Sequence, residues 1–583
     1  MSKDKKKEEK LEKIRHSLSH IMAGAIQKLY PGVKFGIGPA IENGFYYDLD
    51  LPSDISSDDI PKIEKEMRKI IKEGVEFKQK NVSEKEAKEI FKDQPYKMEL
   101  IEELEDNKIS VYESGGFVDL CKGPHVKSSK EINPKAFMLT SIAGAYWRGD
   151  EKNKMLTRVY GVAFESEEEL SEFLKLQEEA KKRDHRKLGE ELDLFCFSDL
   201  VGPGLPLYTP KGTFLKDELQ KKVEEICRRY GFKKVFTPHL AKIKLYELSG
   251  HAKKFGDELF HVSSGKGHEF VLRPVQCPHQ TQIYASKMRS YRDLPIRYME
   301  SDRQYRAEKP GEVGGLSRVY AITVEDGHSF CEVSQVKDEV KGMVNIIKDF
   351  YSSLGLWGSH GVSLSVRDYD HPENYIGEEK DWDLCEQMLQ EVSDEMNLDA
   401  EKREGEAALY GPKLDFMFKD ALGKEIQIPT VQVDFATPKR FDLFYIDSNG
   451  QKKPPVMVHR AVLGSYERFL ALIIEHFAGA FPLWLAPEQM WVIPVSENHA
   501  EYAKKVHEEL LENNFRSILR DDNETVSKKI REGELQKIPY LLVVGDREIK
   551  SNSVSPRYKG EDLGEMKLTD FIKKAKIEVE EEK

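Results

Sequence analysis

The chain has 583 residues, of which 39% are hydrophobic and 10% aromatic, so it can form several domains with separate cores. Its formal net charge of -13 argues against a protein that coats nucleic acid indiscriminately, because that kind of binding needs a basic surface. We therefore expect a multidomain protein with no DNA partner, in which any contact with RNA is local.

Targeting and redox signals favour a cytoplasmic protein with no membrane partner. The N-terminal MSKDKKKEEKLEK is charged and has neither the apolar core nor the small-residue cleavage site of a secretory signal. The most apolar window, 469–487, contains Glu475, His476 and Pro482, which argues against a membrane span. The six cysteines are scattered without a CxxC pair, as expected for reduced thiols.

The N-terminal part predicts an α+β domain that follows a charged tail. Apolar residues recur at helical spacing over 11–30, and the pair Pro31 and Gly32 ends the pattern. Alternating segments such as GFYYDLDL predict strands, and a charged helix is expected near 60–73.

The middle of the chain predicts a connector and then a second domain. A highly charged helix from about 165 through KRDHRKLGEEL has the composition of a solvated connector. A new domain is expected to start near Cys196, where the loop GPGLPLYTPKG precedes an amphipathic helix over 213–230. Strand-like segments continue to about 487, with a helical insertion near 381–396.

Beyond residue 486 the pattern predicts a small α/β domain. The segment WVIPV is followed by a helix over 501–513, a short strand near Ser517, a helix over 526–536 and the strand YLLVVG. Strands that alternate with helices in this way favour a largely parallel core.

Two short segments carry imidazoles and a thiol at helical spacing. His16 and His20 stand four residues apart in RHSLSH, so on a helix they share one face, which suits a metal, a hydrolytic site or a polar core patch. Cys121 and His125 also stand four apart, and together the two segments offer a set that could bind zinc tetrahedrally.

The segment YRAEKPGEVGGLSRV predicts a pocket for a phosphate and an amine. Arg306 and Glu308 alternate on an expected strand, a glycine-rich loop follows, and Arg318 leads the next strand. A guanidinium suits a phosphate and a carboxylate can accept from an exocyclic amine. On this motif alone, however, a surface cross-strand ion pair is the favoured interpretation. A weaker motif, HRAVLGSYERF, places Gly464 at a strand-to-helix junction and Arg468 on the helix.

With Pro238 after FKKVFTPHL, these motifs resemble the three signature motifs of class II aminoacyl-tRNA synthetases. More closely, the chain resembles the threonyl-tRNA synthetases over nearly its whole length. The matching segments, in order, are GFYYDLDL, DLCKGPHV, AGAYWRGDEKNKML, KRDHRKLGEELDLF, SYRDLPIR, YGPKLDF, PVMVHRAVLGSYERF and PLWLAP.

The resemblance implies an α+β multidomain fold with a class II catalytic core on an antiparallel sheet. The expected parts are a charged tail (1–10), an α+β editing domain (11–164), a helical linker (165–195), the catalytic domain (196–486) and an α/β anticodon-binding domain (487–583). Only the tail precedes RHSLSH, where the family usually carries a ubiquitin-like domain, so we expect that domain to be missing. A homodimer is expected through the region 213–239.

The implied activity is that of a threonine–tRNA ligase. L-threonine would be activated with ATP, accompanied by Mg²⁺, to threonyl-adenylate and transferred to tRNA(Thr). Serine lacks only a methyl group of threonine, a difference of about 1 to 3 kcal/mol that is too small for faithful selection. The resemblance therefore also implies hydrolytic editing of seryl-tRNA(Thr).

The resemblance assigns one zinc ion to the amino-acid pocket, held by Cys277, His328 and His459. Their wide spacing predicts no metal by itself, and without the family a buried Cys and core histidines would be the better interpretation. A metal that accepts both the amine and the hydroxyl of threonine would reject valine, which has no hydroxyl.

The resemblance also assigns the nucleotide contacts. Arg306 would hold the α-phosphate, Glu308 the adenine amine and Arg318 the outer phosphates, while Arg468 would stack on adenine. The remaining positions implied to line the threonine or nucleotide pocket are Asp326 and Tyr410 for threonine, Lys413 as a catalytic group, and Gln427 for ATP.

Two further sets of residues come from the resemblance. In the threonyl enzymes the editing site is generally metal-free, whereas the related alanyl editing domains hold zinc; the matching residues here are His16, His20, Lys97, Asp119, Cys121 and His125. Positions that contact anticodon bases in the family are Asn523, Arg531, Glu548 and Arg557, for which a solvated charged face is the alternative.

The chain departs from the family pattern at four positions and leaves other functions open. Val275 and Gln276 stand where the family usually has MN, Val324 replaces a glutamine, and Pro429 replaces a glycine. The departures at Val275, Gln276 and Val324 suit a second hypothesis, a synthetase-like RNA-binding or regulatory protein without aminoacylation. A third hypothesis, a zinc-dependent hydrolase based on HSLSH, explains none of the later motifs.

Overall fold

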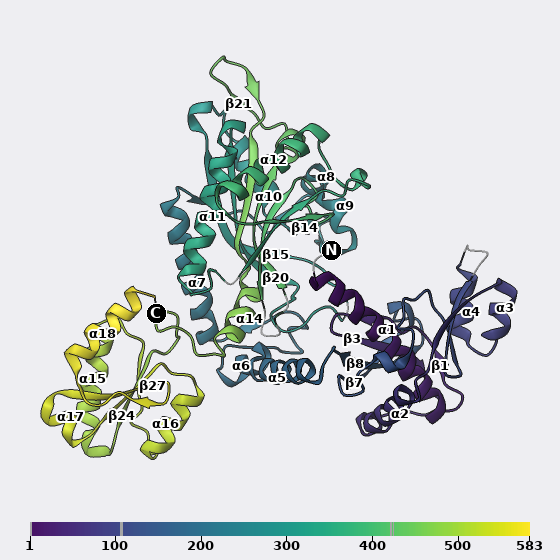
Figure 1. Cartoon of the computed structure of the whole chain (residues 1–583). Helices are drawn as coiled ribbons and strands as arrows, with labels where there is room; N and C mark the ends of the chain where they lie inside the picture. The colour runs from purple at the N-terminus through teal and green to yellow at the C-terminus, as the bar shows by residue number, and fades with distance from the viewer. Residues whose placement is uncertain are drawn as a thin grey trace. The chain divides into compact units, whose positions relative to one another are not determined.

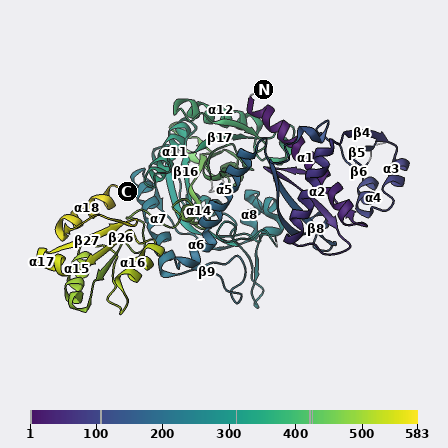
Figure 2. The ribbon, with the colours of Figure 1, turned by 60° about the horizontal axis from the view of Figure 1, so that its bottom comes forward.

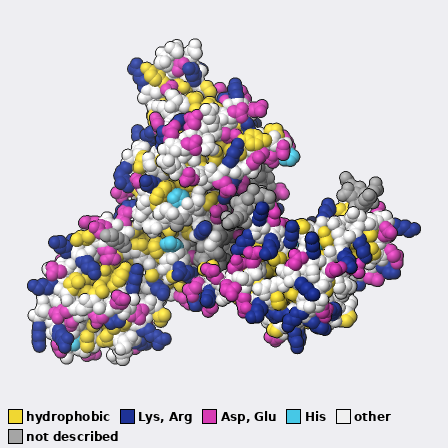
Figure 3. All heavy atoms as spheres, in the orientation of Figure 1, with side chains coloured by type: hydrophobic (Ala, Val, Ile, Leu, Met, Phe, Trp, Pro, Cys, Tyr) yellow, Lys and Arg dark blue, Asp and Glu magenta, His cyan; other side chains and the backbone are white. Residues whose placement is uncertain are grey.

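The computed structural model describes residues 3–104, 109–309, 311–358, 360–419, 423 and 425–582 (Figure 1). The chain forms two compact units, Met1–Glu178 and Glu179–Lys583, which we call the N-terminal and C-terminal units. Within the described residues, no helix is both long and apolar enough to cross a bilayer. Figure 3 shows Lys and Arg interspersed with Asp and Glu on the visible face of both units, in keeping with an overall acidic chain.

The N-terminal unit has a main sheet covered by two helices. The apolar face of α1, with Leu18, Met22 and Ile26 fully buried, packs with α2 against an antiparallel sheet in the order β1-β3-β8-β7. The elements are α1 (Lys3–Leu29), α2 (Ile60–Glu73), β1 (Lys34–Phe35), β2 (Ala40–Ile41), β3 (Gly44–Asp50), β7 (Phe137–Tyr146) and β8 (Met155–Ala163).

Most of the expected charged tail is helical, because α1 begins at Lys3. Lys7 pairs with Glu169 (2.7 Å) and Lys10 with Glu165 (2.8 Å). The charged N-terminal run therefore extends α1, although the two ion pairs are exposed and each contributes little stability.

A second, three-stranded sheet of the same unit is antiparallel in the order β4-β5-β6. The strands β5 and β6 contact α1, which places the residues after β6 against the helix that carries His16 and His20. The elements are β4 (Phe77–Val82), α3 (Glu84–Ile90), α4 (Pro95–Glu102), β5 (Ile109–Ser114) and β6 (Phe117–Leu120).

The prediction of a single, solvated connector helix is wrong for the second half of that segment. The helix breaks at Asp184 into α5 (Glu167–Arg183) and α6 (His185–Glu191). In α6, His185, Leu188 and Gly189 are buried, and the helix packs on α14 (Tyr466–His476), as Figures 1 and 2 show. The high charge of the segment did not indicate the burial of α6, because the buried residues occupy one narrow face of a short helix.

The C-terminal unit is built on an eight-stranded sheet in the order β11-β15-β16-β23-β20-β19-β17-β18. All inner pairs are antiparallel, and only the two outermost pairs are parallel, which confirms the predicted antiparallel catalytic core. The strands are β11 (Lys233–Lys234), β15 (Ile296–Tyr305), β16 (Ala321–Cys331), β17 (Gly361–Val366), β18 (Glu401–Glu404), β19 (Lys413–Lys419), β20 (Glu425–Asp434) and β23 (Val456–Ser465).

Long amphipathic helices bury one side of this sheet. The helix α11 contacts β16, β20 and β23 and packs on α7 and α12, and its apolar residues join the largest core of the molecule. The helices are α7 (Pro210–Arg229), α8 (Ile243–Ser249), α9 (His251–Phe255), α10 (Cys277–Ala285), α11 (Val336–Ser352), α12 (Glu379–Glu395) and α13 (Ala436–Arg440).

Three short pairings complete this part of the unit: β9 with β10, β12 with β14 and β13, and β21 with β22. Their bounds are β9 (Phe195–Cys196), β10 (Leu207–Tyr208), β12 (Leu240–Ala241), β13 (His261–Ser263), β14 (Glu269–Leu272), β21 (Tyr445–Ile446) and β22 (Lys452–Lys453).

The last part of the chain is an α/β fold with its own core. The strands β25, β24 and β26 are parallel, and β27 pairs antiparallel with β26, which confirms the predicted largely parallel core. The elements are β24 (Met490–Pro494), α15 (Ala500–Glu512), β25 (Ser517–Leu519), α16 (Val526–Leu535), β26 (Tyr540–Val544), α17 (Asp546–Ser551), β27 (Ser553–Tyr558), β28 (Glu561–Asp562), β29 (Met566–Lys567) and α18 (Leu568–Glu580).

Candidate functional site

A cavity of about 290 Å³ lies over β16, β20 and β23 of the large sheet. It collects residues from segments that are far apart in the sequence, including most of those predicted for threonine and ATP. Those predicted residues are Cys277, Arg306, Glu308, Arg318, Asp326, Tyr410, Gln427, His459 and Arg468.

Arg306 and Glu308 do not lie on a strand as predicted. The strand β15 ends at Tyr305, because from there the backbone changes its hydrogen-bond partners. The Arg306 N–H donates to the backbone carbonyl of Tyr320 (2.9 Å), and the Ala307 N–H donates to the backbone carbonyl of Glu258 (2.8 Å). Arg318 likewise lies in the loop ahead of β16 rather than on the strand.

The cavity is rich in guanidinium groups. Burial lowers the pKa of Arg306 and of Arg468, and neighbouring arginines lower both further. Arg318 pairs with Glu308 (2.6 Å) and Glu312 (3.0 Å), so an ion pair exists here, although in a loop and not across strands. A bound polyphosphate would relieve the repulsion between the cations and give Arg318 a stronger partner.

Cys277, His328 and His459 meet beside this cavity. Their ligand atoms all lie within 4.8 Å of one another, and all three residues are buried. Cys277 is the first residue of α10, whereas His328 and His459 are directly paired across β16 and β23. The strand register therefore decides that these distant residues can share one ion.

The donor atoms suit a zinc ion. The side-chain oxygen of Gln280 accepts from Nδ1 of His328 (2.8 Å), which leaves Nε2 without a proton. That Nε2 is buried and finds no hydrogen-bond partner in the described part of the chain. One thiolate and two imidazoles with room for further ligands match a catalytic type of zinc site.

Two predicted threonine contacts border this trio. Burial, with Glu325 next in effect, raises the pKa of Asp326 to about 8. Tyr410 stacks on the ring of His459, with 4.6 Å between centroids, and donates to Gln432 (2.7 Å). A carboxylate this buried favours a cation beside it, such as an ammonium group or a metal ion.

Lys413 is not among the residues that line the cavity. Its Nζ lies 3.0 Å from Asp415, whose other oxygen accepts from Gln427 (2.6 Å). Lys413 is thus linked to the cavity through Asp415 and Gln427, and its direct catalytic role remains a prediction.

Of the departures from the family pattern, two line the cavity and a third, Gln276, is buried behind the residues that line it. Val275 and Val324 line the cavity. Gln276 is fully buried behind it and donates to the carbonyl of Asp302 (3.0 Å). Its side chain therefore supports the end of β15 instead of facing the cavity.

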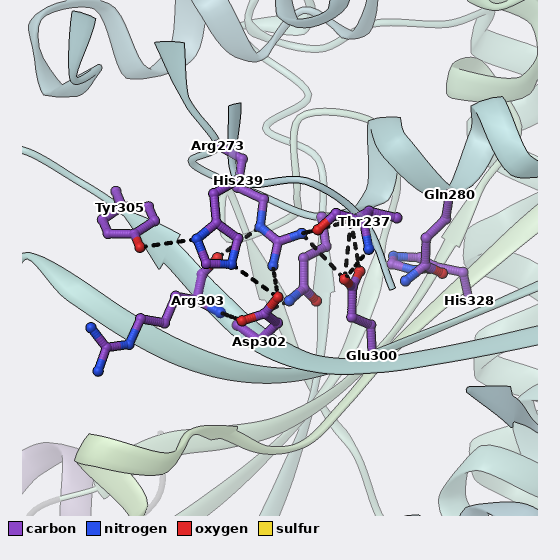
Figure 4. Close-up of polar contacts among 10 residues, drawn as sticks. Thr237, His239, Arg273, Gln280, Glu300, Asp302, Arg303, Tyr305 and His328 are labelled. Atoms are coloured by element: carbon purple, nitrogen blue, oxygen red, sulfur yellow. Dashed lines mark hydrogen bonds and ion pairs between the residues drawn. The ribbon is translucent and has the colours of Figure 1, made fainter. Parts of the chain in front are cut away.

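A buried network around Arg273 was not predicted (Figure 4). The fully buried guanidinium donates to Thr237 Oγ1 (2.6 Å) and the Arg303 carbonyl (2.7 Å), and it pairs with Asp302 (2.9 Å). His239 also contacts Asp302 (3.0 Å). This network joins the segment around Pro238 to β15 just before Arg306, and no local motif signals it.

The N-terminal unit brings together all six residues predicted for editing. Nε2 of His16 and Nε2 of His125 each lie 3.3 Å from Cys121 Sγ, and His20 completes a group whose ligand atoms lie within 4.8 Å of one another. Ser17 contacts His125 Nδ1 (3.1 Å).

Charged groups lie directly behind this cluster. Asp119 pairs with the buried Lys97 and lies 3.5 Å from His20 Nε2. Tyr47, which the sequence reasoning missed, donates to Asp119 and accepts from Lys97 (3.2 Å). Only the alternation of GFYYDLDL, which turns Tyr47 inward from β3, could have indicated it.

Burial keeps the three histidines and the cysteine of this cluster uncharged. It lowers the pKa of His125 to about 2, lowers that of His16, and lowers that of His20 well below its ordinary value. Burial also raises the pKa of the Cys121 thiol to about 11. At neutral pH the cluster therefore offers neutral imidazoles and a thiol instead of a thiolate nucleophile.

The four predicted anticodon contacts lie in the C-terminal α/β fold. Asn523 and Arg531 are exposed, and Arg557 on β27 borders a cavity of about 330 Å³. Glu548 accepts from the Gly545 N–H (2.8 Å), so its carboxylate caps the start of α17. The contacts of these residues with RNA remain predictions.

Comparison with known protein families divides the chain in the same order. Residues 109–160 match the threonyl and alanyl tRNA synthetase second additional domain. Residues 260–477 match the tRNA synthetase class II core domain (G, H, P, S and T), and residues 489–578 an anticodon binding domain.

Individual proteins are similar over almost the whole chain. A threonine–tRNA ligase of Cytophaga hutchinsonii is 46% identical over 97% of this chain and 88% of its own length, and one of Gloeobacter violaceus is 48% identical over 97% and 92%. Among solved structures, the RNA binding domain of threonyl-tRNA synthetase from Cryptosporidium parvum is 34% identical, with a TM-score of 0.63, and covers 68% of this chain and 98% of its own.

Proposed function

Because the chain belongs to the threonyl-tRNA synthetase family of class II aminoacyl-tRNA synthetases, we propose that it is a threonine–tRNA ligase. It activates L-threonine with ATP and transfers the threonyl group to tRNA(Thr). The observation that carries this function is the shared cavity, in which three arginines lie beside Cys277 and His459, two members of the trio that His328 completes.

Activation is an attack of the threonine carboxylate on the α-phosphate of ATP, with pyrophosphate as the leaving group. This chain contributes positioning and charge neutralisation. Arg306 holds the α-phosphate, Arg318 holds the outer phosphates, and Glu308 and Arg468 hold the adenine. Mg²⁺ bound with ATP would help to neutralise the charge of the phosphates. Gln427 lines the pocket beside them, and Lys413, which is linked to Gln427 through Asp415, is the further catalytic group that we propose.

Selection of threonine rests on the amino-acid side of the cavity, with Asp326 toward the amine and Tyr410 beside it. A zinc ion held by Cys277, His328 and His459 would supply Lewis-acid contacts for the amine and hydroxyl of threonine. Valine has no hydroxyl to offer, so a site built in this way rejects it.

We assign the cluster of the N-terminal unit to hydrolysis of seryl-tRNA(Thr). The support is the convergence of His16, His20, Cys121 and His125 in front of the Lys97–Asp119 pair. Neutral imidazoles can position water and move protons, and we propose that they do so without a metal.

For the remaining parts we keep the predicted domain bounds, although the second half of the linker, α6, packs on α14. We propose an editing domain at 11–164, a linker at 165–195, a catalytic domain at 196–486 and an anticodon-binding domain at 487–583, in a cytoplasmic homodimer. Recognition of unstacked anticodon bases is assigned to Asn523, Arg531, Glu548 and Arg557.

The direct test is ATP/pyrophosphate exchange with a panel of amino acids. Exchange that depends on threonine and not on valine is expected. If no amino acid supports exchange although tRNA still binds, the chain is instead a synthetase-like RNA-binding protein.

A further inference from the structure

His185, the first residue of α6, lies at the meeting point of three segments of the C-terminal unit. It is 6% exposed, although the connector around it is highly charged. Its Nδ1 lies 2.7 Å from a carboxylate oxygen of Glu475 on α14, and its backbone N–H donates to the same oxygen (3.2 Å). The Leu316 N–H donates to its Nε2 (3.1 Å).

These contacts define the protonation of the ring. A backbone N–H can only donate, so Nε2 carries no proton, and Nδ1 therefore donates to Glu475. Asp184, His185 and Glu475 lie close enough to form a candidate metal site, but both ring nitrogens of His185 are already engaged. The arrangement is that of an orienting pair and not of a metal centre.

Leu316 belongs to a small hairpin, 314–318, that carries Arg318. The hairpin is closed by backbone contacts between Gly314 and Arg318, and Leu316 itself is fully buried. Gly315 has φ +52°, and a Cβ on it would come within 2.3 Å of His185 Nε2. The hairpin and the imidazole are therefore fitted closely to each other.

The nucleotide cavity lies on the other side of the same hairpin. Arg468, on the first turn of α14, donates to the carbonyl of Ser317 (3.2 Å). A hollow of about 670 Å³ shares Arg318, Gln427 and Arg468 with the cavity and also has Glu475 on its wall. One helix thus supports the hairpin twice, directly through Arg468 and indirectly through Glu475 and His185.

We propose that His185, oriented by Glu475, is a positioning residue for ATP. It holds the backbone of the 314–318 hairpin so that Arg318 faces the outer phosphates. It touches no substrate, and its effect reaches the phosphates only through Leu316 and the hairpin. This inference rests on the proposed ATP-dependent function.

Two substitutions of His185 distinguish the hydrogen bond made by Nδ1 from the one made by Nε2. In His185→Gln the amide oxygen can take the place of Nε2 and still accept from Leu316. In His185→Asn the shorter amide can take the place of Nδ1 and still donate to Glu475, but it leaves the Leu316 N–H without its acceptor. His476→Gln is a matched control, since the His476 ring packs on Phe477, with 4.8 Å between centroids.

The experiment measures threonine-dependent ATP/pyrophosphate exchange in the full-length chain. In His185→Asn the KM for ATP should rise about five- to tenfold, the size of one lost hydrogen bond, with kcat and the KM for threonine nearly unchanged. His185→Gln and His476→Gln should stay within about twofold of the wild type.

A second readout distinguishes positioning from general loss of structure. Binding of a nonhydrolysable threonyl-adenylate analogue, which lacks the outer phosphates, should be unchanged in His185→Asn. The inference is overturned if ATP and the analogue weaken together, or if the KM for ATP does not change. If the wild-type chain shows no exchange with any amino acid, it is the proposed function that fails.

Discussion

His328 and His459 are directly opposed residues on the neighbouring antiparallel strands β16 and β23, with ring centroids 4.7 Å apart. Cys277 reaches them from the start of α10. The trio therefore depends on strand register, because a shift by one residue would turn one imidazole to the opposite face of the sheet.

Replacing Cys277 with Ala should remove zinc and threonine activation together, because the trio loses its only thiolate. Elemental analysis of the purified protein and threonine-dependent exchange measure the two effects. Cys331→Ala is a suitable control, since Cys331 is a buried cysteine at the end of β16 outside the trio. Unchanged zinc content in Cys277→Ala would refute the assignment.

Replacing Val324 with Gln should be tolerated. The residue lines the cavity, so the new amide can add one hydrogen bond to threonine or ATP. A net change of about 0.5 to 1.5 kcal/mol corresponds to an affinity change of about tenfold or less. Steady-state exchange kinetics measure it, and complete loss of activity would mean that the pocket differs in shape from that of the family.

Replacing both His16 and His20 with Ala should leave threonine activation intact but allow seryl-tRNA(Thr) to accumulate. The substitutions remove two of the neutral imidazoles to which we assign the positioning of water. Deacylation of preformed seryl-tRNA(Thr) measures the effect, with threonine-dependent exchange as the internal control. Tyr47→Phe should slow deacylation less, because it removes only the hydroxyl that links Asp119 and Lys97. Normal deacylation by the double variant would make RHSLSH a structural segment.

The N-terminal unit should lose stability as the pH falls below about 6.5. Burial lowers the pKa of His16, His20 and His125 in the folded chain, so below that pH the unfolded chain binds protons that the folded chain does not. Each histidine can contribute at most about 1.4 kcal/mol per pH unit, and the partly exposed His16 and His125 contribute less.

Hydrogen exchange of the α1 amides, corrected for intrinsic rates, measures this loss between pH 7 and pH 5. In His20→Gln the dependence on pH should be shallower, because the most buried imidazole is gone. An equal dependence in wild type and variant would show that His20 does not titrate on unfolding in this range.

Replacing Phe236 with Glu should weaken the proposed homodimer. The side chain is 81% exposed, next to β11 and within the region predicted to form the interface. An apolar group this exposed is stabilised by a partner surface, and a carboxylate there would be desolvated without a counterion. Sedimentation velocity should show a dimer for the wild type and for Leu535→Glu, which changes a comparably exposed residue on α16. A dimeric Phe236→Glu would place the interface elsewhere.

Local patterns in the sequence determined much of the fold. The helix over 60–73 has the predicted bounds, and the alternation of strands and helices after residue 486 predicted the parallel core. Such patterns succeed because a helix or a strand buries one face, and the spacing of apolar residues records that face directly. Family motifs added the residues of the cavity and of the cluster that we assign to editing, although not their geometry.

Tertiary structure alone decided the contacts between distant segments. No periodicity relates Arg273 to Asp302 or His185 to Leu316, because their partners come from other elements, whose register and packing are set by the whole core. The same reason explains two of the errors. The strand expected to include Arg306 ends early because its backbone finds other partners, and α6 is buried because α14 covers it. The point at which a strand ends, and whether a polar ring is buried, depend on which surfaces pack together in the folded chain. Neighbouring residues in the sequence do not carry this information.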